Sequence, residues 1–162
     1  MKYLKLICIT LILTVAAQGQ DTEVTARIEA TVIESLEMII LADIDVGTVI
    51  PSEGILRLNP RTDSGAGIIK LEGRPNSAVQ VSFSSQIEMV NVATNTTLSV
   101  TYKVSGNEDN VQSASDIFVT NPQNIFLNNL GEYYLWIGCE FSMENLVSGQ
   151  YDGDFVIDVD YN

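Results

Sequence analysis

The chain closes on the run 151–161, Tyr-Asp-Gly-Asp-Phe-Val-Ile-Asp-Val-Asp-Tyr, in which mainly apolar residues alternate with mainly acidic ones. A second run, residues 23–33, places an alanine or a branched apolar residue at every even position from Val24 to Val32. A period of two residues is typical of a β-strand with one face on a core and the other in water. We therefore predict that the folded domain begins and ends in strands.

Between these runs lie shorter apolar segments, each bounded by Gly, Pro, Asn or Ser, which are turn-forming residues. None of these segments shows the spacing of an amphipathic helix. The pattern predicts an all-β fold, an antiparallel Ig-like β-sandwich of about 8–10 short strands, with a small β-barrel as the alternative. The inner strands are predicted at residues 36–41, 45–50, 55–58, 68–71, 78–84, 97–104, 117–119 and 133–142.

The first 19 residues have the pattern of a bacterial signal peptide. Lys2 and Lys5 precede an apolar run at residues 6–17, and Ala17-Gln18-Gly19 offers small residues for cleavage after Gly19. The alternative is a retained anchor, but the run is shorter than the roughly 20 residues that span a bilayer. We expect an exported chain, residues 20–162, that forms one domain in the periplasm, on the cell surface or outside the cell.

Composition excludes several kinds of chemistry. The chain has no histidine, so a catalytic triad or a His-ligated zinc site is absent. Of its 8 basic residues two leave with the signal peptide, so 6 remain against 21 acidic residues and the formal charge falls from −13 to −15. This charge argues against nucleic-acid binding. Cys139 becomes the only cysteine, which precludes an internal disulfide. We expect a protein that is not an enzyme and has no cofactor.

Acidic side chains near the end of the chain are weak candidates for a Ca²⁺ site. Asp152 and Asp154 share a face with Asp158 and Asp160 if the last strand is regular, and Asp109 lies in a predicted loop. A line of carboxylates on a flat strand does not converge on one ion, however. The alternative is that these aspartates keep a solvent face soluble and discourage strand pairing at an edge.

Cys139 and Trp136 fall on opposite faces of the predicted strand 133–142. Cys139 has an odd position number like Leu135 and Phe141, so it has the same parity along the strand and faces the same, apolar side. This position predicts a buried, unreactive thiol. Trp136 has the opposite parity, and an outward Trp beside Gly138 could stack on a sugar or anchor a protein partner. The alternative for Trp136 is that it covers a turn or a sheet edge.

Three stretches together resemble an uncharacterised family of secreted bacterial β-sandwiches, a domain of unknown function. They are residues 44–51 (IDVGTVIP), residues 135–139 (LWIGC) and residues 149–161, which begin GQYDGDF. The structural glycines of this pattern are Gly47, Gly138 and Gly149. The resemblance implies the sandwich fold and brings no function with it.

The closing run is also similar to the end of chaperone-usher pilus subunits and of spore-coat-U-type proteins. Gly149 stands fourteenth from the end, apolar residues alternate after it, and the penultimate residue is aromatic. The resemblance implies a strand that another chain can complete, with residues 24–32 as the donated strand. The alternative is that residues 24–32 are the domain's own first strand, which closes the sandwich without a donor. The expected interaction residues are Trp136, Tyr151, Phe155, Ile157, Val159 and Tyr161.

These patterns predict a structural or adhesive surface protein, pilin-like in that strand pairing drives its assembly. Its partners would be proteins or further copies of itself, with no nucleic acid and no stable membrane span after cleavage. The alternative is an extracytoplasmic module that binds a surface glycan or another ligand through Trp136 or a loop.

Overall fold

A computed structural model describes residues 35–47 and 54–162. These residues form eleven β-strands and one short 3₁₀ turn, Gln112–Ala114, and every strand pair is antiparallel. The strands are β1 Glu37–Ala42, β2 Ile55–Leu58, β3 Gly67–Glu72, β4 Ala78–Phe83, β5 Gln86–Asn91, β6 Thr97–Asn107, β7 Asp116–Ile117, β8 Gln123–Phe126, β9 Glu132–Ser142, β10 Tyr151–Asp152 and β11 Ile157–Tyr161.

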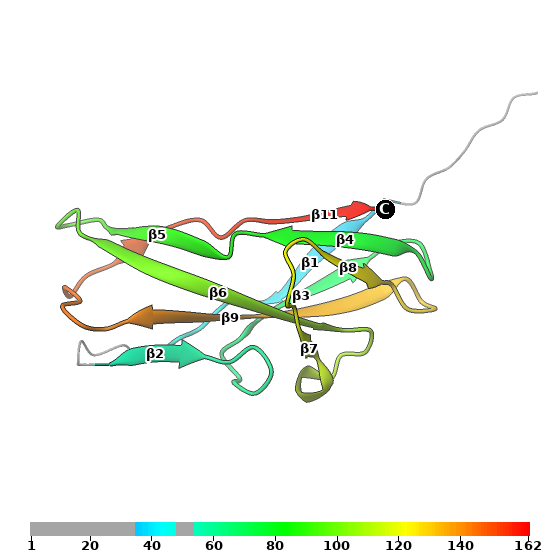
Figure 1. The fold of residues 1–162 in the computed structure, drawn as a ribbon, viewed down its shortest axis with the longest axis horizontal. Helices are drawn as coiled ribbons and strands as arrows, with labels where there is room; N and C mark the ends of the chain where they lie inside the picture. The colour runs from blue at the N-terminus through cyan, green and yellow to red at the C-terminus, as the bar shows by residue number, and fades with distance from the viewer. Residues whose placement is uncertain (1–34, 48–53) are drawn as a thin grey trace, which may run out of the picture. The chain divides into compact units, whose positions relative to one another are not determined.

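The strands divide into two sheets (Figure 1). The larger sheet has the order β1-β3-β9-β6-β5-β10, with β2 added beside β9 and β7 beside β6. The smaller sheet has the order β11-β4-β8. This arrangement confirms the predicted antiparallel sandwich over the small barrel, because the strands remain in two separate sheets.

Two apolar clusters make up the core. The first lies between the sheets, where Leu71 and Leu135 of the larger sheet pack with Val79, Val81 and other residues of the smaller one. The second is built on Val100, Cys139 and Phe141 of the larger sheet and contains no residue of the smaller sheet. The smaller sheet therefore covers only part of the larger one, because its strands of 4 to 6 residues face β6 and β9, which have 11 residues each.

Most predicted strands are present within a residue or two of their expected ends, but two strands were missed. β5 was missed although Ile87 and Met89 alternate with Gln86 and Glu88, the pattern of a strand with one face in water. β8 was missed because it begins directly after Pro122, in a stretch whose Asn and Pro residues predict a turn. Residues 45–47 are not in a strand, and residues 48–50 lie outside the described residues. The predicted signal peptide and the strand at residues 24–32 also lie outside them.

No helix in the part of the chain that the structure describes has the length and apolar character needed to cross a membrane.

The buried phenol of Tyr133 gives the fold an expected weakness at alkaline pH. Burial, followed by the negative charges of Asp116 and Glu108, raises the pKa of Tyr133 to about 12. In the unfolded chain the same phenol ionises near pH 10. Between these values only the unfolded state loses the proton. Tyr133 therefore leaves the free energy of unfolding unchanged below about pH 10 and lowers it progressively as the pH rises towards 12.

We expect this phenol to remove about 2–3 kcal/mol of unfolding free energy across that window. Urea denaturation from about pH 8 to about pH 12 measures the loss, and Tyr133→Phe should flatten it relative to the wild type. An identical pH slope in the two proteins would show that Tyr133 does not titrate as its burial requires.

Candidate functional site

The first strand, β1, leaves apolar side chains exposed at the edge of the larger sheet. Cross-strand pairing places Met38 opposite Leu71 and Ile40 opposite Ile69, so Met38 and Ile40 point towards the same face as these core residues. They are nevertheless 46% and 68% exposed. The only strand beside β1 in the described ranges is β3. The core side of β1 is thus largely open at Met38 and Ile40, and one backbone edge of β1 has no strand partner among the described residues.

The last strand, β11, forms the matching edge of the smaller sheet. Ile157, Val159 and Tyr161 face inwards and are half-buried against the first core cluster, whereas Asp158 and Asp160 are exposed. β11 pairs with β4, and within the described residues it has no strand on its other side. Its backbone N–H and C=O groups on that side are available for a further strand.

The beginning of β1 and the end of β11 lie at the same end of the sandwich. A Cβ built on Gly73 would contact both Leu36 and Tyr161, at 2.9 and 2.5 Å. The Tyr161 hydroxyl accepts a hydrogen bond of 2.7 Å from the backbone N–H of Arg74, whose guanidinium carbon lies 5.5 Å from the Tyr161 ring centroid. We call β1 and β11 together the open edge. Both strands present apolar side chains on the core side of this edge.

The predicted terminal strand is wrong in one respect, because it is two strands in two sheets. Tyr151 and Asp152 form β10, which pairs with β5 of the larger sheet, and the chain then crosses to β11 in the smaller sheet. Phe155 lies in the crossing segment and packs on Tyr102, with 4.6 Å between ring centroids. The break means that the four aspartates do not form one regular row on one strand.

The candidate calcium ligands are not brought together. Asp152 lies in β10, Asp154 lies in the crossing segment, and Asp109 lies in the loop after β6. No group of three or more acidic or cysteine side chains suited to a metal ion occurs in residues 35–47 and 54–162. The three candidate residues therefore do not belong to one site.

Trp136 is not a surface residue, contrary to the expectation that it meets a ligand. Its side chain lies on the outer face of β9, as parity predicts, but it is only 1% exposed. Tyr134 stacks beside it with 6.3 Å between ring centroids. An indole this deeply buried cannot stack on a sugar, so the proposed glycan contact at Trp136 is wrong.

Two loops explain why this outer face is covered. The side-chain amide of Gln112 donates hydrogen bonds of 2.9 Å to the carbonyl oxygens of Pro60 and Asp63. Arg61 donates to the carbonyl of Ser113 at 3.1 Å. Ser115 donates to Ser105, the cross-strand neighbour of Trp136, at 2.8 Å. The loop after β2 and the 3₁₀ turn are therefore tied to each other and to the sheet.

The three predicted glycines occupy different environments. A Cβ on Gly138 would overlap the carbonyl oxygen of Leu58 and lie 2.6 Å from the Cδ of Pro60, so only a residue without a side chain fits at this position. Gly149 has φ of 150° and packs against the buried side chain of Asn91. Gly47 has φ of 66° and open space around it. Gly138 and Gly149 thus serve close packing, whereas Gly47 serves a left-handed backbone conformation.

A charged cluster that the sequence did not reveal lies on the outer face of the larger sheet. The ammonium group of Lys70 lies 2.5 Å from a carboxylate oxygen of Glu72 and 2.6 Å from one of Glu132. Hydrogen bonding to Lys70 lowers the pKa of Glu132, and hydrogen bonds to Glu132 and then Glu72 raise the pKa of Lys70. Glu132 is 62 positions away in sequence, so only strand pairing brings it to Lys70.

Cys139 is a buried free thiol, as its parity predicts. Burial raises the pKa of the Cys139 thiol, so it is protonated near neutral pH. It lines a pocket of about 450 Å³ together with Tyr151, one of the predicted interaction residues. Sequence periodicity places Cys139 on the inner face, but it does not show that a cavity lies above it.

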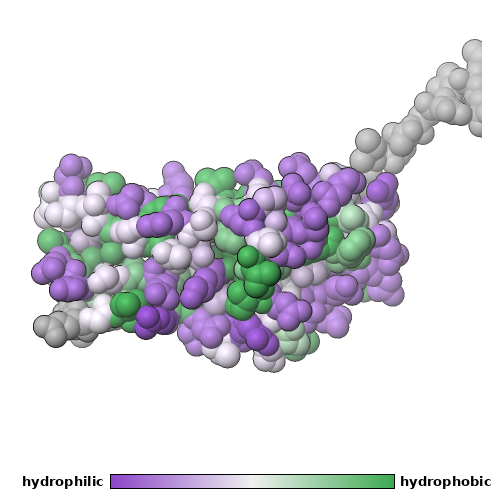
Figure 2. Space-filling view, viewed as in Figure 1, coloured by the Kyte–Doolittle hydropathy of each residue, from purple (hydrophilic) through white to green (hydrophobic). Residues whose placement is uncertain are grey.

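The strongest apolar patch on the face seen in Figure 2 lies over the segment between β7 and β8. Val119 in this segment is 88% exposed, and Ile117 at the end of β7 is 37% exposed. Elsewhere on this face hydrophilic and apolar residues are mixed. This patch is small and isolated in comparison with the open edge, where two strands contribute.

Comparison with known proteins places the chain in a family. None of the curated proteins matches it. Among solved structures it is similar to a chain of the structure described as "Chaperone-tip adhesin complex is vital for synergistic activation of CFA/I fimbriae biogenesis", with 14% identity and a TM-score of 0.46. The match covers 80% of this chain and 42% of that one, so this chain spans less than half of its length. Residues 40–161 match the family model described as "Domain of unknown function (DUF4402)", and the chain belongs to that family.

Proposed function

We propose that this protein is an exported, non-enzymatic structural or adhesive surface subunit that assembles by strand pairing at the open edge. The observation that carries the proposal is the exposure of Met38 and Ile40 on the core side of β1. An apolar strand at an unpaired sheet edge is a site for adding a strand from another chain, and natural proteins usually protect such edges. β1 has no charged or proline residue after Glu37 to protect it.

The proposed occupant is the segment 24–32 of a second copy. Its alternation supplies one apolar face for the core side and one polar face for solvent. It has nine residues, whereas β1 has 6 and β11 has 5, so it is long enough to pair along the whole open edge. The even positions would cover Met38, Ile40 and Val159.

The chain's connectivity fixes the direction in which a molecule's own segment could close the open edge. Only residues 33–36 connect this segment to β1, which starts where β11 ends. A molecule's own segment, folded back through so short a connection, would run antiparallel to β1 and therefore parallel to β11. A segment from another copy is free to take either direction, and antiparallel to β11 it would run parallel to β1, so the two directions differ only in which of the two strands gains the antiparallel pairing. Repeated donation is a head-to-tail contact and builds a filament.

The test is the assembly state of the exported chain, measured by size exclusion with light scattering. We expect Ile40→Glu to abolish oligomers, because the docked strand would bury the new carboxylate. Ile39→Glu is the matched control, since Ile39 lies on the outer face opposite Lys70 and a carboxylate there has a basic neighbour. A peptide of residues 23–33 should also compete with assembly, and a scrambled peptide should not.

Two outcomes would overturn the proposal. One is a monomer at every concentration that neither assembles nor binds the peptide. The other is a monomer that binds the peptide only after residues 20–33 are removed, because the open edge would then be closed by the molecule's own segment.

A further inference from the structure

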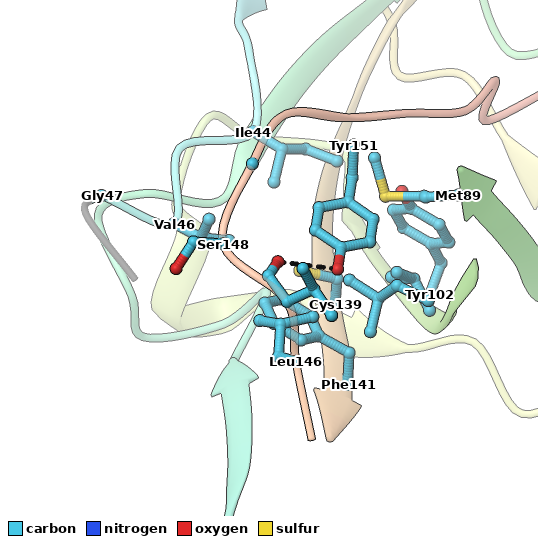
Figure 3. A pocket seen from close by; sticks show the side chains of 14 residues that line it. Ile44, Val46, Gly47, Met89, Tyr102, Cys139, Phe141, Leu146, Ser148 and Tyr151 are labelled. Carbon is cyan, nitrogen blue, oxygen red and sulfur yellow. Dashed lines mark hydrogen bonds between the residues drawn. The ribbon is translucent and has the colours of Figure 1, made fainter. Parts of the chain in front are cut away.

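A pocket lies where the smaller sheet stops covering the larger one. Its floor is the inner face of β6 and β9, where Val100, Cys139 and Phe141 line it; Figure 3 labels Cys139 and Phe141. Its walls come from the segment between β9 and β10 and from residues 44–47. The volume of about 450 Å³ lies within the range of about 300–1,000 Å³ that is usual for small-molecule sites.

The segments that form the walls of the pocket are anchored by hydrogen bonds. The Tyr151 hydroxyl donates to the carbonyl of Val147 at 2.8 Å, a bond drawn in Figure 3. The N–H of Val92 donates to the carbonyl of Gln150 at 3.1 Å. On the other side, the N–H of Asp45 donates to the carbonyl of Gly65 at 2.8 Å. The pocket thus lies between two segments that are each hydrogen-bonded to neighbouring parts of the domain.

The chemistry of the lining selects the ligand. None of its 14 residues carries a charge, although the chain as a whole has a formal charge of −13. No basic side chain is present in the lining to hold a carboxylate or phosphate, and no acidic one to hold a cation. The polar side-chain groups are the neutral thiol of Cys139, the Ser148 hydroxyl and the hydroxyls of Tyr102 and Tyr151. A mainly apolar lining of this kind favours a ligand that is itself mainly apolar.

We propose that this pocket binds a small neutral molecule with a hydrocarbon body and at most one hydroxyl-type polar end. The hydrocarbon would lie against Val100, Phe141 and Leu146. The polar end would lie at the rim, where the Ser148 hydroxyl can donate or accept and the Tyr151 oxygen can still accept a hydrogen bond. This site is separate from the open edge, and its occupancy does not depend on assembly.

The first experiment uses the neutral fluorophore N-phenylnaphthylamine as the probe. We expect saturable binding, and we expect dodecanol to displace the probe at roughly tenfold lower concentration than dodecanoate, because burial of an unpaired carboxylate is costly. This comparison distinguishes a neutral lipid or alcohol from a free fatty acid as the source of the hydrocarbon. Preferential displacement by dodecanoate would overturn the assignment of a neutral ligand.

The second experiment places the ligand at Cys139 without altering the chain. N-ethylmaleimide alkylation of Cys139, followed by peptide mass spectrometry, should slow about tenfold at a dodecanol concentration near ten times its dissociation constant. An unchanged alkylation rate during proven binding would place the ligand elsewhere and overturn the proposal.

Variants separate the pocket from other apolar surfaces. Leu98→Trp, at a half-buried lining position, should weaken probe binding at least about tenfold by filling the cavity. Val119→Trp adds the same side chain to an exposed position outside the pocket and should leave binding unchanged. Ile40→Glu should also leave it unchanged. Probe binding lost in Ile40→Glu and retained in Leu98→Trp would assign the probe to the open edge and refute the pocket.

Discussion

Trp136→Ala is expected to lower the free energy of unfolding by about 3–5 kcal/mol, the usual cost of removing a buried Trp side chain. Trp136 is 1% exposed and lies on the outer face of β9, where the two covering loops are tied together by the hydrogen bonds of Gln112 and Arg61. Removal of the indole leaves a cavity under these loops. The loops cannot collapse into it without breaking those bonds, so the full cost should be felt.

The measurement is guanidinium denaturation followed by far-ultraviolet circular dichroism, since Trp136 is the only Trp and its fluorescence is lost with the substitution. Trp136→Phe is the matched control and should retain most of the stability, because it keeps a large apolar ring in the site. The wild-type fluorescence should also resist quenching by acrylamide. A loss below about 1 kcal/mol for Trp136→Ala would mean that the loops do not cover the indole in solution.

Gly138→Ala is expected to destabilise the domain by roughly 3 kcal/mol, the upper end of the usual cost of overpacking. The added methyl group would overlap the carbonyl oxygen of Leu58 and lie 2.8 Å from the nitrogen of Pro60. Both contacts are with backbone atoms, which cannot rotate away as a side chain can. The end of β2 and the loop after it must therefore move off the sheet.

The matched control for this effect is Gly47→Ala, where a Cβ meets no atom within 4 Å. Its cost should be limited to about 1–2 kcal/mol from the left-handed backbone at φ of 66°. Urea denaturation of both variants tests the difference. Equal losses at the two positions would show that close packing at Gly138 is not the cause. A loss at Gly138 should also increase the acrylamide quenching of Trp136, because the loop after β2 is part of its cover.

The contrast between Trp136 and Cys139 shows what the alternation of residues along a strand can predict and what it cannot. Alternation along residues 133–142 correctly predicts that Cys139 faces the core and that Trp136 faces the opposite side of the sheet. It does not predict burial on that opposite side. Burial of Trp136 depends on loops whose contacts join residues 49 to 52 positions apart, such as Gln112 with Asp63 and Arg61 with Ser113. No local pattern encodes such contacts.

The same distinction applies to the open edge. The apolar run at residues 36–41 predicts a strand, and β1 is present there. Its composition alone would suit a strand buried on both faces. The exposure of Met38 and Ile40 depends on how far the smaller sheet extends over the larger one, and the unpaired backbone edge of β1 depends on its place at the end of the strand order. Similarly, the terminal alternation persists from Tyr151 to Tyr161, yet the chain changes sheets between them.

By itself, then, the sequence determined the properties that each residue and its near neighbours carry. These are the antiparallel all-β class, the approximate strands, the acidic charge, the absence of histidine and the inner position of Cys139. Tertiary structure alone decided which strands stand at the edges, which outer face is covered by loops and where the core opens into a pocket. The physical reason is that a period of two assigns a side chain to a face of a sheet, whereas burial on that face depends on what distant segments place against it.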